Sequence, residues 1–167
     1  MEVWTASADR TRPWKENKMI HFDVGTHIYR PLTQVFAFVA TPENDFQWQY
    51  GTLTSTQISG GEIGIGTVFR AVGHLLGRRM ETEYQITVFE LNKKYGFQSV
   101  SGPVDSSALY TFEMDKGGTR INLSTRVSST DLFKPNETIV GKKFKKQSKE
   151  NLAMLKSVLE AHRIVQS

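Results

Sequence analysis

The chain has 167 residues, of which 38% are hydrophobic and 23% charged, with no cysteine and a formal net charge of +4 at pH 7. This length and balance predict one globular domain with a sizeable core and argue against an intrinsically disordered chain. The lack of cysteine excludes a disulfide scaffold, a thiolate metal site and a cysteine nucleophile, and it suits a cytoplasmic location, which we expect.

Residues 1–18 are polar and precede a second methionine, Met19. We expect them to form a poorly ordered extension, followed by a single domain over residues 19–167. They lack the apolar core of a signal peptide. No apolar run in the chain approaches the ~20 residues that an α-helix needs to span a bilayer.

The first predicted elements are a strand and a helix. Residues 21–30, HFDVGTHIYR, alternate between apolar and polar side chains, which is typical of a strand. Pro31 suits the first turn of a helix because it has no N–H to satisfy there, and the pair Thr41-Pro42 ends that helix. A short segment over residues 42–51 follows and carries three aromatic side chains.

The clearest hairpin lies between residues 67 and 90. A two-residue turn at residues 76–77 pairs Leu75 with Arg78. The same register places Arg70 opposite Glu83, which is a favourable charge pair, and a slip of one residue would lose that pair. The face expected to point inward holds Phe69, Ala71, Met80, Thr82, Tyr84 and Ile86.

Three more strands and a long helix complete the chain. The strands are expected at residues 93–102, 108–115 and 119–127, with a turn at 115–118 between the last two. The helix is expected from about Glu137 to His162, with Asn136 as its N-cap. Its apolar stripe holds Val140, Phe144, Leu155, Val158 and Leu159, and Lys142, Lys145, Lys146, Lys149 and Lys156 lie roughly opposite.

The glycine-rich stretch GGEIGIG, residues 60–66, raises the question of a phosphate-binding loop. Such a loop needs a helix directly after the glycines, because the free N–H groups of the helix bind the anion. A strand, TVFRAV, follows instead, so the stretch predicts a turn. The four histidines are far apart and none has metal-ligand spacing, so we expect no metal and no cofactor.

Taken in order, six segments resemble the START-like superfamily of helix-grip proteins, also called SRPBCC. The resemblance is greatest to its polyketide cyclase/dehydrase and lipid-transport branch. The segments are the opening strand into RPLTQVFAFVATPENDFQW, GIGTVF, GRRMETEYQITVFE, YGFQSVSGP, YTFEMDKGGTRINL and ENLAMLKSVLEAH. The resemblance implies an α+β helix-grip fold. In it a curved antiparallel β-sheet wraps around a long C-terminal α-helix, with two short helices after the first strand.

The same resemblance implies an internal cavity between the sheet and the C-terminal helix. For each aromatic side chain the alternative is plain core packing. Asn151 lies near the middle of the apolar stripe, one turn after Ser148, so it should have a partner, either a ligand or the sheet backbone. The expected ligand-binding residues are Trp48, Phe69, Met80, Thr82, Tyr84, Phe97, Ser99, Tyr110, Phe144, Asn151 and Leu155.

Catalytic residues are harder to assign. Glu81 and Glu83 form a carboxylate pair, but the hairpin register points them outward, beside arginines. Tyr84 and Tyr110 are the candidates for catalysis, provided that a neighbouring cation lowers their pKa. The inward polar set is Tyr84, Tyr110, Thr82, Ser99, Asn151 and Arg78, and none is a base near neutral pH.

Three functions are therefore compared. The favoured one is binding or transport of a small hydrophobic or amphipathic ligand, such as a lipid, a polyketide or an aromatic compound. The alternatives are an enzyme of the polyketide cyclase/dehydratase type that needs no metal, and a co-chaperone-like protein-interaction module. The lysine-rich run of the last helix predicts a solvated outer face rather than a nucleic-acid site, with weak attraction to an anionic membrane surface as the alternative.

Overall fold

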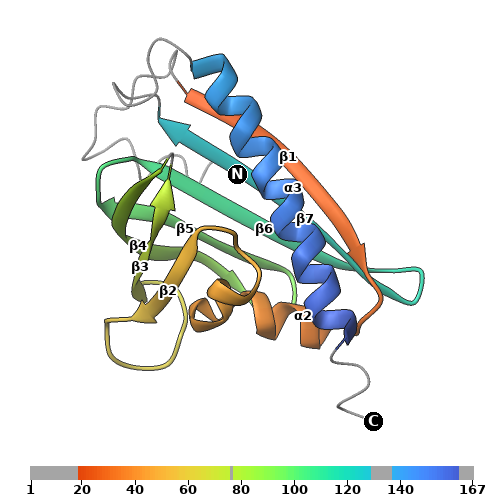
Figure 1. Cartoon of the computed structure of the whole chain (residues 1–167). Coiled ribbons are helices and arrows are strands. Elements are labelled where there is room, and N and C mark those ends of the chain that lie inside the picture. Colours follow the sequence, from red (N-terminus) through yellow and green to blue (C-terminus); the bar gives the residue numbers. More distant parts are fainter. Residues whose placement is uncertain (1–18, 76, 129–136, 162–167) are drawn as a thin grey trace.

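A computed structural model describes residues 19–75, 77–128 and 137–161 (Figure 1). The expected extension over residues 1–18 and the expected cap Asn136 lie outside the described residues. One antiparallel sheet has the strand order β1-β7-β6-β5-β4-β3-β2. The strands are β1 (Met19–Ile28), β2 (Thr52–Gln57), β3 (Val68–Leu75), β4 (Arg78–Glu90), β5 (Lys94–Ser101), β6 (Ser106–Asp115) and β7 (Gly118–Ser128).

Three helical elements accompany the sheet: α2 (Leu32–Val39), the 3-10 helix η2 (Pro42–Gln47) and α3 (Glu137–Ala161). The expected two short helices after the first strand are confirmed. Pro31 immediately precedes α2, and Thr41 is extended before Pro42, as a residue preceding proline prefers. The buried face of α2 consists of Val35, Phe36 and Val39.

The predicted hairpin register is confirmed. Leu75 pairs with Arg78, and Arg70 pairs with Glu83. The Arg70 guanidinium lies 2.9 Å from the Glu83 carboxylate, and Glu81 lies 3.7 Å from the same guanidinium. Both glutamates therefore belong to a charge ladder on the outer face of the sheet.

The sheet is curved, and α3 crosses its concave face (Figure 1). Register shifts interrupt the pairing of β4 with β5 and of β2 with β3, and such bulges bend and twist the strands. The helix packs most closely against β1, at one edge of the sheet.

The buried face of α3 is close to the predicted stripe. Val140, Leu155 and Leu159 are buried as expected, whereas Val158 is only partly buried. Leu152, which the predicted stripe omits, is 1% exposed.

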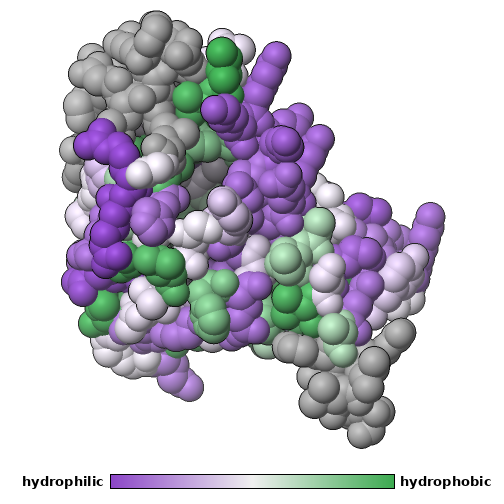
Figure 2. Space-filling view, in the orientation of Figure 1, coloured by the Kyte–Doolittle hydropathy of each residue, from purple (hydrophilic) through white to green (hydrophobic). Residues whose placement is uncertain are grey.

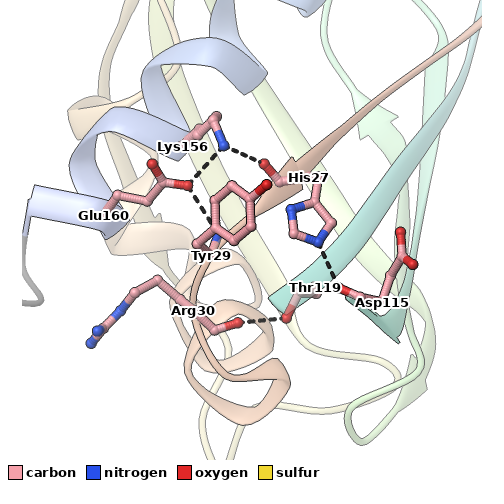
Figure 3. A network of polar contacts seen from close by, with 7 residues as sticks. All are labelled: His27, Tyr29, Arg30, Asp115, Thr119, Lys156 and Glu160. Carbon is pink, nitrogen blue, oxygen red and sulfur yellow. Dashed lines mark hydrogen bonds and ion pairs between the residues drawn. The ribbon is translucent and has the colours of Figure 1, made fainter. Parts of the chain in front are cut away.

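The prediction for one lysine of α3 is wrong. Lys156 does not lie on the exposed face, because its ammonium donates hydrogen bonds to the His27 carbonyl at 2.7 Å and to Glu160 at 2.8 Å (Figure 3). Glu160 also accepts the Tyr29 N–H at 2.9 Å, and the ammonium lies 4.7 Å from the centre of the Tyr29 ring. These contacts hold the C-terminal half of α3 against the end of β1.

Candidate ligand cavity

A cavity of about 300 Å³ lies between the concave face of the sheet and α3. Its walls come mainly from strands β3 to β7, with Phe22 of β1, Thr52 of β2 and the loop between η2 and β2 also contributing. The helix contributes Phe144, Gln147, Ser148 and Asn151. A hollow of this kind, mostly apolar with a few polar groups, is typical of a small-molecule site.

An aromatic wall forms one side of the cavity. Tyr84 stacks against Phe69 with ring centres 5.4 Å apart and meets Phe97 edge-on at 5.1 Å. Farther along, Trp48 meets Tyr110 edge-on at 6.2 Å. Tyr84, Phe97, Trp48 and Tyr110 all line the cavity, so a flat ligand would meet ring faces and ring edges there.

The loop between η2 and β2 is fastened to α3 by Asn151. The side-chain oxygen of Asn151 accepts the backbone N–H of Tyr50 at 2.9 Å and the side-chain amide of Gln147 at 3.1 Å. The partners of Asn151 are thus a loop backbone N–H and a side chain of α3, and not the sheet backbone that is one of the two expected partners. Gly51 supports the arrangement with a φ of 86°, a value that favours glycine.

A close approach of two chain segments lies beside this contact. The Cβ of any other residue at Gly73 would come within 2.2 Å of the Gly51 carbonyl oxygen. Glycine is therefore required where β3 passes the loop. Both glycines line the cavity.

The cavity lining holds no aspartate, glutamate, lysine or arginine among the described residues. Its histidine, His74, is exposed at the rim. Burial raises the pKa of Tyr84, although the hydroxyls of Ser106 and Thr82 oppose the change. Burial also raises the pKa of Tyr110. The neighbouring cation that catalysis by these tyrosines requires is not found in the described lining, and both remain neutral phenols near pH 7.

Asp45 is a buried acid that no pattern in the sequence singles out. It lies on η2, is 7% exposed and does not line the cavity. Burial raises its pKa well above the ordinary range; Ser55 opposes this change and the nearby Glu43 carboxylate adds to it. A lone aspartate in a short polar segment gives no signal of this burial, because tertiary packing creates it.

The structure brings eight of the eleven predicted site residues to the cavity. The other three lie elsewhere: Phe69 is packed behind Tyr84, Leu155 is in the core, and the Ser99 hydroxyl accepts the Ser106 N–H at 3.0 Å. The eight at the cavity are Trp48, Met80, Thr82, Tyr84, Phe97, Tyr110, Phe144 and Asn151.

Several lining residues are missing from the predicted set. On β6, Ser106 and Ala108 lie on the same strand face as Tyr110, at a spacing of two residues. On β7, Thr125 and Val127 likewise lie on the same face as Leu123. The two-residue period of a strand identifies these, once Tyr110 and Leu123 are assigned inward. Gln49 and Tyr50 come from a loop, where no period indicates direction.

The sequence model of the family described as polyketide cyclase / dehydrase and lipid transport matches residues 19–160. The chain belongs to this family. The expected resemblance to the START-like superfamily, and the helix-grip fold that it implies, are confirmed. No curated protein sequence matches the chain.

Two solved structures share the fold. The crystal structure of Ara h 8.0201 matches with a TM-score of 0.66 and 16% identity, over 86% of this chain and 99% of that one. The crystal structure of TTHA0849 from Thermus thermophilus matches with a TM-score of 0.67 and 17% identity, over 88% of this chain and 99% of that one. At this identity the likeness concerns the fold alone.

The described residues show no site for a metal and no membrane span. They contain no group of three or more His, Asp or Glu side chains placed to hold a metal ion. None of the described helices is both long enough and apolar enough to cross a bilayer.

Proposed function

We propose that this protein binds and carries a small hydrophobic or amphipathic molecule in the cavity between the sheet and α3. The observation that carries the proposal is the lining itself. It combines an aromatic wall with a few uncharged polar groups. Such a surface gains free energy by burying apolar ligand area, at roughly 25 cal/mol per Å².

The enzyme alternative has one observation in its favour, since both candidate tyrosines line the cavity. A neutral phenol can donate a proton or a hydrogen bond. It cannot act as a general base near pH 7 when burial raises its pKa. Because a cyclase or dehydratase needs both an acid and a base, binding without chemistry is the better-supported function.

Native mass spectrometry of the freshly purified full chain tests the carrier function, followed by solvent extraction of what it holds. We expect a small apolar compound at near-stoichiometric amount. The variant Ala71→Phe, which places a large ring at a lining position of β3, should lose it. The control Glu113→Phe adds the same ring at an exposed position of β6 and should keep it.

Two results would contradict the proposal. One is a compound retained equally by Ala71→Phe and Glu113→Phe, because it would then lie outside the cavity. The other is a chain that is empty when purified and remains empty after incubation with a panel of apolar compounds. Circular dichroism of both variants establishes that the sheet is intact.

A further inference from the structure

The absence of charged side chains from the described cavity lining restricts the charge of the ligand. A carboxylate or ammonium inside the cavity would lose its water and meet no charge of opposite sign among the described lining residues. The free energy needed to remove the hydration shell of a charged group is far larger than the free energy gained from a few apolar contacts.

The Tyr110 hydroxyl is a hydrogen-bond donor without a protein partner among the described residues. The Tyr110 hydroxyl differs in accessibility from the indole nitrogen of Trp48, which is fully buried and has no hydrogen-bond partner in the described part of the chain. The hydroxyl belongs to a lining residue and is not one of the sealed polar atoms. It is therefore available to an acceptor on a bound molecule, and leaving such a group unpaired on binding is costly.

The size of the cavity favours a compact ligand. A volume of about 300 Å³ lies at the lower end of the ~300–1,000 Å³ that ligand pockets commonly have. A compound of two fused rings with a short substituent fits this space. A pocket of this size suits such a compound better than a lipid with two long acyl chains.

We propose that the ligand is an uncharged aromatic compound of about two rings that carries a carbonyl or ether oxygen, and that this oxygen accepts a hydrogen bond from the Tyr110 hydroxyl. The inference rests on the proposed function. It adds the charge, the size and the polar group of the ligand. Tyr84, Phe97 and Trp48 supply the surfaces against which the rings pack.

Three probes of nearly equal shape test it by equilibrium dialysis at pH 7 with the full chain. They are 2-acetylnaphthalene, which is a neutral ketone, 2-isopropylnaphthalene, which has no acceptor, and 2-naphthoate, which is an anion. The ketone should bind about two- to tenfold more tightly than the hydrocarbon, as one neutral hydrogen bond allows. The naphthoate should bind at least about tenfold more weakly than the ketone.

Tyr110→Phe should abolish the preference for the ketone over the hydrocarbon while leaving hydrocarbon binding in place. Tyr95→Phe is the matched control. Tyr95 is a buried tyrosine whose ring stacks on that of Tyr110 at 6.1 Å, yet it does not line the cavity. The preference should survive in that variant.

The outcomes separate the two proposals. If the hydrocarbon binds but the ketone preference is absent, or persists in Tyr110→Phe, the assignment of the acceptor is wrong and the cavity remains a binding site. If naphthoate binds as well as the ketone, the restriction to uncharged ligands is wrong. If none of the three probes binds, the proposed function fails, and the inference fails with it.

Discussion

Asp45 is the buried acid of η2, and its burial lowers the stability of the fold by an amount that depends on pH. A carboxyl group whose pKa is raised in the folded state stabilises the fold when it is protonated. That contribution is fully present below the unfolded-state pKa, near 3.8, and is lost as the pH rises through the folded-state pKa. Asp45 therefore makes the protein less stable at pH 7 than at pH 4.

Asp45→Asn, which resembles the protonated form, should be more stable than the unmodified chain at pH 7 and nearly equal to it at pH 4. We expect a gain of about 1 kcal/mol or more in the free energy of unfolding at pH 7. Urea unfolding at both pH values measures it. Glu62→Gln removes a carboxylate from an exposed residue and should show no such pH dependence. A loss of stability in Asp45→Asn at pH 7 would contradict this prediction.

Asn151 fastens the loop between η2 and β2 to the helix through the Tyr50 N–H. Asn151→Leu keeps a similar volume but leaves that N–H without its acceptor. The free energy of unfolding should fall by about 1–2 kcal/mol. Lys149→Leu, at an exposed position of the same helix, should change it by no more than about 0.5 kcal/mol. Equal effects of the two changes would show that the contact does not stabilise the fold.

At the scale of elements, the two halves of α3 differ in their contacts with the rest of the protein. Its C-terminal half is fixed to β1 by the hydrogen bonds of Lys156 and Glu160, near the buried bond from the Thr119 hydroxyl to the Arg30 carbonyl at 2.8 Å (Figure 3). Its N-terminal half contributes Phe144 and Gln147 to the cavity wall. The anchored half is therefore expected to unfold last.

Lys156→Met should loosen the anchored half of α3, because the methionine keeps the apolar stem and removes the donor to the His27 carbonyl. The expected cost is about 0.5–1.5 kcal/mol, reduced by the partial exposure of the ammonium. Amide hydrogen exchange over residues 152–161 is the direct measurement. Lys142→Met, on an exposed residue, is the control. Unchanged exchange rates in Lys156→Met would show that the anchor contributes little.

At the scale of the whole molecule, charge is unevenly distributed. Residues 136–167 contain seven Lys or Arg and three Asp or Glu, so this segment accounts for the whole net charge of +4. Much of the visible surface in Figure 2 is hydrophilic. The exposed lysines of α3 are Lys142, Lys143, Lys145, Lys146 and Lys149. Since the same helix lines the cavity, an anionic membrane that attracts these lysines would bring the ligand site close to the bilayer.

We expect weak, salt-sensitive binding to vesicles that contain phosphatidylserine, because each lysine near such a surface contributes about 1 kcal/mol. The double change Lys145→Glu and Lys146→Glu should reduce binding at least about tenfold. The control reverses the charges of Lys93 and Lys94, which are exposed at the turn between β4 and β5. Vesicle sedimentation at low and high salt measures both. Binding that is insensitive to salt, or equally lowered by the control, would contradict a role for α3.

Most of the elements, and the register of the hairpin formed by β3 and β4, follow from the sequence alone. Side-chain periods of two and of 3.6 reflect which face of a strand or helix is buried, so they predict the hairpin register and most of the buried face of α3. Alternation on β6 and β7 also identifies four lining residues that the predicted set omits: Ser106, Ala108, Thr125 and Val127. These signals lie within about one element of chain, which is why local patterns are enough to recover them.

The remaining features depend on tertiary packing. Asn151 and Tyr50 are 101 positions apart, and Lys156 and His27 are 129 apart, so no local pattern joins them. The burial of Asp45, the volume of the cavity and the position of Phe69 behind Tyr84 follow from how curved strands and a helix pack together. Periodicity indicates that a side chain points inward, whereas packing decides whether it meets a neighbour or a cavity.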